Sequence, residues 1–168
     1  MSLETEFQVY NLGDVNVIEL LLSLRYKYDS KLFEGDELTP VLATGDNSFK
    51  EEIITTYLVL DEYIKKSKLT PIQKKIIDMV NEGYNYDEIG FELDIDSTGI
   101  GNRLKTACRK IKKVNDREWR KSVYTNKLGL KTKSCSKCKE ELPATSEFFG
   151  DLRHSRDGFH SQCRLCKE

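Results

Sequence analysis

Apolar side chains recur at helical spacing through much of the first two thirds of the chain. A broad apolar face predicts a helix over residues 14–29, and a stripe of Ile, Tyr and Leu predicts a second over 48–68. Between them, residues 31–47 hold glycines, a proline and four acids, which predicts a loop. No apolar run is long enough and free enough of polar residues to span a bilayer.

Start and stop signals divide the next stretch into three short helices. The capping box Thr70–Gln73 begins the first, and Gly83 stands where a left-handed residue ends it. A second capping box, Asn85–Glu88, begins the next helix, and Asp96 caps the third. The apolar positions of that third helix, which we expect to reach about Val114, share one face: Ile100, Leu104, Ala107 and Ile111. We expect Cys108 to be a small core residue beside them.

The tight turn between the second and third helices makes a helix-turn-helix. The third helix of such a unit fits the major groove of duplex DNA, where its exposed side chains reach base edges. We therefore predict DNA-binding residues at Ser97, Thr98, Gly101, Asn102, Arg103, Lys105, Thr106, Arg109, Lys112 and Lys113. The alternative is a three-helix bundle that binds protein.

Charge is distributed unevenly along the 168 residues, although the formal net charge is −1. Residues 1–102 hold 9 Lys/Arg and 20 Asp/Glu, whereas residues 103–168 hold 18 Lys/Arg and 8 Asp/Glu. A basic half beside an acidic half favours nucleic acid as one partner, with two solvated surfaces as the alternative. Within the basic half, Trp119 and Tyr124 are interleaved with Lys and Arg, so this stretch could follow phosphates or serve as a solvated linker.

The central segment resembles a known family. The residues that carry the resemblance are Gly83, Asn85-Tyr86-Asp87-Glu88-Ile89-Gly90, Leu93, Ile95-Asp96, Ile100, Arg103-Leu104 and Ala107. They are similar to region 4 of bacterial sigma factors, and nearly as similar to the LuxR-type regulator domain, over about 45 residues. The resemblance implies a promoter-reading domain that acts with RNA polymerase. Asp94 replaces the usual turn glycine, and residues 1–68 show no core-binding region of a sigma factor.

Four of the five cysteines form two Cys-x-x-Cys pairs separated by 24 residues. Four thiolates in this pattern are typical of one structural Zn²⁺ ion. The predicted metal ligands are Cys135, Cys138, Cys163 and Cys166. Because all four are cysteines, we expect no open position for a reactive water. His154 and His160 are alternative ligands, for which we favour surface positions instead.

The cysteine segment also resembles a known zinc module. The pattern Cys135-x-x-Cys138-Lys139-x-x-Leu142-Pro143, followed by Phe148-Phe149, Asp157-Gly158 and Cys163-x-x-Cys166, is similar to the module of phage-type endonuclease VII-like and other HNH nucleases. The resemblance implies a phage or prophage protein that binds nucleic acid. The catalytic His and Asn of such nucleases lie beyond the module, and the chain ends two residues after Cys166. We therefore expect a protein that is not an enzyme.

Together these features predict a mainly α fold class with four parts. They are an acidic helical region for a partner or interface (1–68), a sigma-region-4-like helix-turn-helix (69–114), a basic linker (115–134) and a small treble-clef or ribbon-like zinc module (135–168). The favoured function is that of a phage or prophage transcription factor that binds duplex DNA sequence-specifically, as a sigma-like or RNA-polymerase-associated protein. The alternatives are an accessory protein in packaging or recombination, a small zinc-module nuclease, or an inhibitor of host polymerase. We expect a cytoplasmic protein without a membrane partner, and its oligomeric state stays open.

Overall fold

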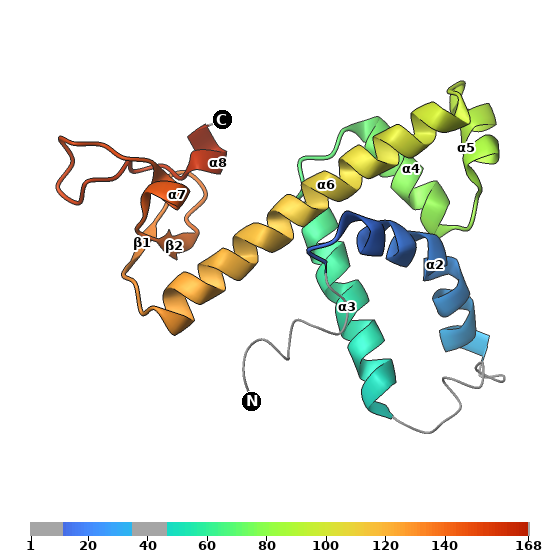
Figure 1. The fold of residues 1–168 in the computed structure, drawn as a ribbon, viewed down its shortest axis with the longest axis horizontal. Coiled ribbons are helices and arrows are strands. Elements are labelled where there is room, and N and C mark those ends of the chain that lie inside the picture. The colour runs from blue at the N-terminus through green and yellow to red at the C-terminus, as the bar shows by residue number, and fades with distance from the viewer. Residues whose placement is uncertain (1–11, 35–46, 168) are drawn as a thin grey trace. The chain divides into compact units, whose positions relative to one another are not determined.

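The computed structural model describes residues 12–34 and 47–167, which fall into two compact units divided between Asn115 and Asp116 (Figure 1). Unit 1 contains α2 (Val15–Glu34), α3 (Asn47–Lys66), α4 (Pro71–Asn81), α5 (Tyr86–Leu93) and the first part of α6 (Ser97–Ser122). Unit 2 contains the end of α6, the π-helix η1 (Val123–Lys127), β1 (Thr132–Ser134), β2 (Glu141–Pro143), α7 (Ser146–Phe149) and α8 (Arg164–Lys167). The predicted mainly α fold class is confirmed.

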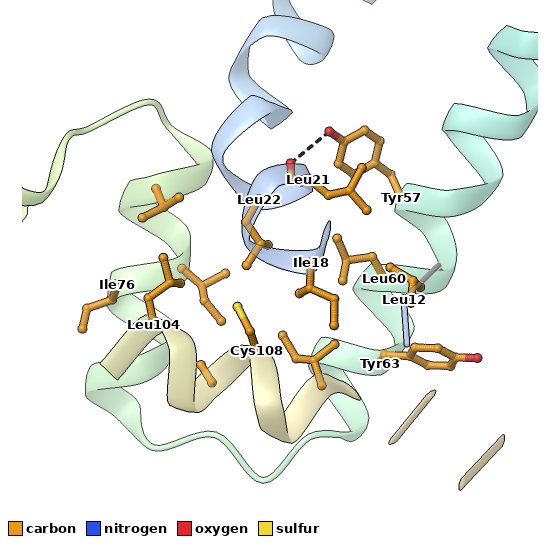
Figure 2. Packing of buried hydrophobic residues seen from close by; sticks show 14 of the residues in the cluster. Leu12, Ile18, Leu21, Leu22, Tyr57, Leu60, Tyr63, Ile76, Leu104 and Cys108 are labelled. Carbon is orange, nitrogen blue, oxygen red and sulfur yellow. Dashed lines mark hydrogen bonds between the residues drawn. The ribbon is translucent and has the colours of Figure 1, made fainter. Parts of the chain in front are cut away.

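One hydrophobic cluster holds unit 1 together. Figure 2 shows side chains from α2, α3, α4 and α6 converging on it. The fully buried members drawn there include Ile18, Leu22, Leu60 and Cys108, so the expected core position of Cys108 is confirmed. The described residues of 12–34 and 47–66 therefore share one core with 71–114, although the sequence places them in separate parts.

Polar contacts between helices add to this core. The Tyr57 hydroxyl donates to the backbone oxygen of Leu21 at 3.0 Å (Figure 2), and the Arg25 guanidinium binds both carboxylate oxygens of Asp61. The Tyr86 hydroxyl donates to Glu19 at 2.8 Å, which links α5 to α2. The first two contacts join α2 to α3, and the third fixes α2 against α5.

The capping signals in the central segment are confirmed. Both reciprocal hydrogen bonds of the box Thr70–Gln73 form at the start of α4, and both form in the box Asn85–Glu88 at the start of α5. Gly83 follows α4 with a φ of +95°, and Asp94 ends α5 in the left-handed region with φ 53° and ψ 48°. The Asp96 carboxylate accepts from the backbone N–H of Gly99 at 3.1 Å and so caps α6.

Several helix ends differ from the prediction. Helix α2 runs to Glu34 instead of 29, and α3 begins at Asn47, which places Ser48 inside its first turn. The loop predicted over 31–47 is shorter than expected, because residues 31–34 belong to α2 and Asn47 begins α3. Its residues 35–46 lie outside the described residues, as do the side chains of 28–34 and 47–50. Helix α6 continues to Ser122 instead of ending near Val114, because its last turns carry side chains that bind residues 140–147 of unit 2.

Unit 2 is small and built around a hairpin. Strands β1 and β2 pair antiparallel with Lys133 opposite Leu142, and an isolated bridge joins Asp151 to Phe159. Its buried cluster contains Leu142, Phe148 and Phe149 together with two cysteines. Phe148 and Phe149 thus form a miniature aromatic core, against which the partly buried Phe159 packs.

Among the described residues, no helix combines the length and the apolar character needed to cross a membrane.

Candidate metal centre and nucleic-acid-binding helix

The four cysteines of the two Cys-x-x-Cys pairs lie together in unit 2. Cys135 and Cys138 occupy the turn between β1 and β2, where Lys139 adopts a left-handed φ of 62° and its N–H donates to the Cys135 carbonyl at 2.9 Å. Cys163 and Cys166 stand at the start of α8 and within it. A backbone hydrogen bond from Ser136 to Ser161 at 2.9 Å ties the two segments together.

The spacing of the sulfurs fits one tetrahedral ion. Zinc binds thiolate sulfur at about 2.3 Å, so four sulfurs in a tetrahedron lie about 3.8 Å apart. The Sγ atoms of Cys138 and Cys163 are 3.9 Å apart, and the four sulfurs all lie within 4.8 Å of one another. These residues could therefore hold a metal ion without a large rearrangement.

Burial and hydrogen bonding give the thiols unequal acidity. Burial would raise the pKa of Cys135, but the backbone N–H groups of Cys163, Cys138 and Lys137 lower that pKa to about 6. The N–H of Cys163 lies 3.2 Å from the Cys135 sulfur. Burial raises the pKa of Cys163 to about 12. A bound cation would favour the ionised form of every thiol in the cluster.

Neither histidine of the chain joins this cluster. Within the part of the chain that the structure describes, the one group of residues able to share an ion consists of the four cysteines alone. His154 is exposed, and Nε2 of His160 lies 3.0 Å from the Lys167 ammonium nitrogen. The surface positions favoured for both residues are consistent with this arrangement.

The exposed face of α6 presents polar and basic side chains at intervals of three or four residues. Thr98, Asn102, Lys105, Arg109 and Lys113 are all exposed, whereas Ile100, Leu104, Ala107 and Ile111 on the opposite face are buried. The remaining predicted DNA-binding residues occupy the flanks of this face: Ser97, Gly101 and Lys112 are partly buried, and Arg103 and Thr106 are exposed.

Some of these side chains already have partners within unit 1. The Ser97 hydroxyl donates to Asp87, and the Thr106 hydroxyl donates to the Asn102 carbonyl at 2.8 Å. The Arg103 guanidinium donates to the Gly99 carbonyl at 3.3 Å. The hydrogen-bonding capacity available for a ligand is therefore greatest along Asn102, Lys105, Arg109 and Lys113.

Acidic residues surround the N-terminal end of α6. Asp87, Asp94 and Asp96 are exposed there, next to a hollow that they line with Phe91 and Ser97. A polyanion is repelled by these carboxylates and attracted by the basic side chains further along the helix. The electrostatics of α6 therefore favour its middle turns, residues 102–113, for contact with nucleic acid.

Three basic side chains of the stretch after Asn115 are paired with carboxylates of unit 2. Arg117 and Lys121 both bind Glu140, at 3.1 and 2.9 Å, and Arg120 binds Glu147 at 2.9 Å. Burial raises the pKa of Glu140, but Lys121 and Arg117 outweigh it and hold that pKa below its ordinary value. A charge count overstates the phosphate-binding capacity of this stretch, because it does not show these pairs.

The sequence did not predict two structural contacts. Gly90 approaches the turn so closely that a Cβ atom there would lie 2.4 Å from the backbone oxygen of Ile95. A glycine inside a short helix, four residues before the turn residue Asp94, is the signal that could have indicated this contact. The pairing of Ser136 with Ser161 has no comparable sequence signal.

Comparison with known proteins gives one short similarity. The chain is 45% identical over 38 residues to YoqL of Bacillus subtilis (strain 168), which its name describes as an HNH endonuclease derived from the SPbeta prophage. The match covers 23% of this chain and 16% of YoqL. No protein-family model matches the chain, and no solved structure matches it. The resemblance to sigma region 4 and LuxR-type domains thus stays a prediction, whereas the predicted resemblance to phage HNH proteins is supported in part.

This similarity contradicts the expectation that the protein is not an enzyme. That expectation rested on the four-cysteine site, which leaves no open position on a metal, and on the absence of a catalytic core within the sequence. A structural metal site does not report on catalytic groups elsewhere, and the chain spans only 16% of a relative that is named as an endonuclease. The expectation is therefore withdrawn.

Proposed function

We propose that the protein binds double-stranded DNA through α6 and that unit 2 is stabilised by one structural Zn²⁺ ion. The observation that carries the proposal is the helix-turn-helix itself. Two capped helices meet at a left-handed Asp94, and α6 exposes a polar and basic face on the side away from the core. An α-helix with such a face fits the major groove, where Asn can pair with adenine and Lys or Arg with guanine or phosphate.

The zinc assignment follows from the donor set. Four thiolates at tetrahedral spacing suit zinc better than hard cations such as Mg²⁺ or Ca²⁺, which bind oxygen. Zinc in this site would hold the two Cys-x-x-Cys segments together. Cys135, Cys138, Cys163 and Cys166 would be its ligands.

The finer part of the proposal is a role in transcription in a phage or prophage context. The similarity to a prophage-derived relative supports that context, and the sequence resemblance to sigma region 4 favours promoter DNA as the target. Selection of bound duplexes from a random library, with and without RNA polymerase, tests this part. An asymmetric motif favours a monomeric reader, and a two-fold motif favours a dimer with half-sites about one helical turn apart. Enrichment that requires polymerase favours a sigma-like protein, and no enrichment in either case contradicts sequence-specific binding.

The substitution Asn102→Ala combined with Lys105→Ala tests the role of α6. Both side chains are exposed, so the fold should be retained while the base-contacting groups are lost. Because each good base contact contributes about 1–3 kcal/mol, we expect affinity for the selected duplex to fall at least tenfold. Fluorescence anisotropy measures the change. Lys65→Ala, which removes an exposed charge from α3, is the control and should leave affinity unchanged.

Endonuclease activity is a second candidate function, favoured by the name of the relative. The test is incubation of the zinc-loaded protein with supercoiled plasmid in Mg²⁺ or Mn²⁺, followed by gel analysis of nicked and linear products. Histidine is the commonest general base in such hydrolyses, and the chain has two histidines, His154 and His160. Cleavage that is lost in the double alanine variant of these residues supports the candidate, and the absence of cleavage by the parent protein contradicts it.

A further inference from the structure

The loop of residues 152–158 in unit 2 is held in one shape by its own hydrogen bonds. The bridge between Asp151 and Phe159 closes it, and the N–H of Leu152 donates to the Gly158 carbonyl at 2.7 Å. Inside the loop, the N–H of Ser155 donates to the Leu152 carbonyl at 3.0 Å and the N–H of Gly158 to the Ser155 carbonyl at 3.2 Å. Gly158 has a φ of +80°, which completes the turn. The loop is thus pre-organised.

The carboxylate within this loop is used internally. Asp157 accepts hydrogen bonds from the Ser155 hydroxyl and from the N–H of Phe159, both at 3.2 Å, and it forms an ion pair with Lys133 of β1. These contacts lower the pKa of Asp157, led by the hydrogen bond from Lys133. The negative charge of the loop is therefore balanced at its base.

The basic side chains of the loop point into solvent. Arg153, His154 and Arg156 are exposed, and none of them contacts a carboxylate in the described part of the chain. Two basic residues near the metal ligands are instead used structurally: Lys137 binds the Cys166 carbonyl at 2.9 Å, and Arg164 binds the Ser146 carbonyl at 2.8 Å. Lys127 and Lys131 are exposed like the loop arginines, but they lie outside the loop. Arg153 and Arg156 thus differ from Lys137 and Arg164 in having their guanidinium groups available.

We propose that the 152–158 loop is a second DNA-binding site, in which Arg153 and Arg156 bind phosphates of the duplex backbone. Guanidinium groups bind phosphate through two parallel N–H donors, and a loop of fixed shape loses little entropy on binding. Because the loop tip is fully in water, a small anion would gain little there, whereas a polyanion gains by releasing its counterions. This site rests on the proposed function for its ligand and adds affinity without reading sequence.

The test is the salt dependence of duplex binding by the full-length, zinc-loaded protein. Each phosphate contact contributes about 0.9 to the slope of log affinity against log salt concentration. The variant Arg153→Ala with Arg156→Ala should therefore show a slope shallower by about 2 and weaker binding to every duplex sequence alike. Arg153→Lys with Arg156→Lys should keep the slope. Lys127→Ala with Lys131→Ala removes two exposed charges elsewhere in unit 2 and is the matched control.

Each outcome bears on the loop separately from α6. If the slope became equally shallow in the loop variant and in the control, any exposed positive charge of unit 2 would contribute alike. That result would overturn the proposed site. An unchanged slope in the loop variant, with zinc content and circular dichroism like the parent, would also overturn it. A shallower slope in the loop variant, together with unchanged affinity in the Asn102→Ala and Lys105→Ala variant, would support the loop site. It would contradict base recognition by α6. A parent protein that binds no duplex would overturn both proposals.

Discussion

Removal of the metal is expected to unfold unit 2 while unit 1 stays folded. The buried cluster of unit 2 is small, Cys135 and Cys163 are among its members and Cys166 packs against it, so the core and the metal site share residues. A unit of this size buries too little apolar surface to be stable without a structural metal or another cross-link. Structural zinc contributes about 10 kcal/mol or more in small modules of this kind.

The measurement is chelation followed by amide hydrogen exchange along the chain. Protection should be lost at Phe148, Phe149 and the hairpin, and it should persist in α4 and the first part of α6, whose core contains none of the candidate metal ligands. Added Zn²⁺ should restore the lost protection. Cys163→Ser should give the same pattern without a chelator, and Cys108→Ala, which keeps a small apolar side chain in the core of unit 1, provides the cysteine control. Loss of protection throughout the chain in one step would contradict two independently stable units.

Gly90→Ala is expected to destabilise unit 1 by about 2 kcal/mol or more, although alanine normally stabilises a helix by about 1 kcal/mol over glycine. The added Cβ would lie 2.4 Å from the Ile95 carbonyl oxygen. That oxygen belongs to the backbone and cannot rotate away. The residues next to it are fixed as well, because the N–H of Ile95 donates to the Gly90 carbonyl at 3.0 Å and Asp96 caps α6. The turn would have to open to admit the methyl group.

The matched control for this change is Gly101→Ala in α6. There the added Cβ meets the Tyr86 ring at 3.5 Å, an ordinary van der Waals contact, so the variant should gain up to about 1 kcal/mol from helix propensity. Thermal denaturation followed by circular dichroism should show opposite shifts of Tm for the two variants. A Gly90→Ala protein with unchanged or raised Tm would mean that the turn relaxes at no cost.

Short-range signals explain which parts of the fold the sequence predicted well. A capping box is a pair of hydrogen bonds three residues apart, so Thr70 with Gln73 and Asn85 with Glu88 identify their helix starts directly. The four cysteines were predictable for a similar reason, because each pair lies within four residues. The buried face of α6 follows from its helical period, and all four of its predicted members are buried.

Contacts between distant residues explain what the sequence did not predict. Helix α6 continues through Arg117 and Lys121 because Glu140, about twenty residues further on, binds both side chains. Helices α2 and α3 share a core with α4 and α6, and a hydrogen bond joins Tyr86 to Glu19, which is 67 residues away in the sequence. An apolar stripe shows that a helix has a partner, but it does not identify which partner.

In the candidate site, too, local patterns predicted some features, and contacts between distant residues determine the others. The residue types and spacing indicate metal ligands at Cys135 and Cys163, and the structure brings their sulfurs together. For α6 the sequence predicted an exposed face but not the internal partners of Ser97 and Thr106. Nor did it predict that Asp87 of α5 joins Asp94 and Asp96 at the N-terminal end of that face. Side-chain partners of this kind depend on rotamers and tertiary packing, which a linear pattern does not record.

The burial of Cys108 makes it a natural reporter of unit 1. Its side chain is fully inaccessible, and burial, with a further contribution from the charge of Glu19, raises its pKa to about 12. When a metal holds the other four sulfurs, alkylating reagents can modify this thiol only in molecules whose helical core has opened. The rate of labelling therefore measures the opening of one unit within the intact chain. Mass spectrometry of labelled protein, with and without duplex DNA, would show how strongly ligand binding closes that core.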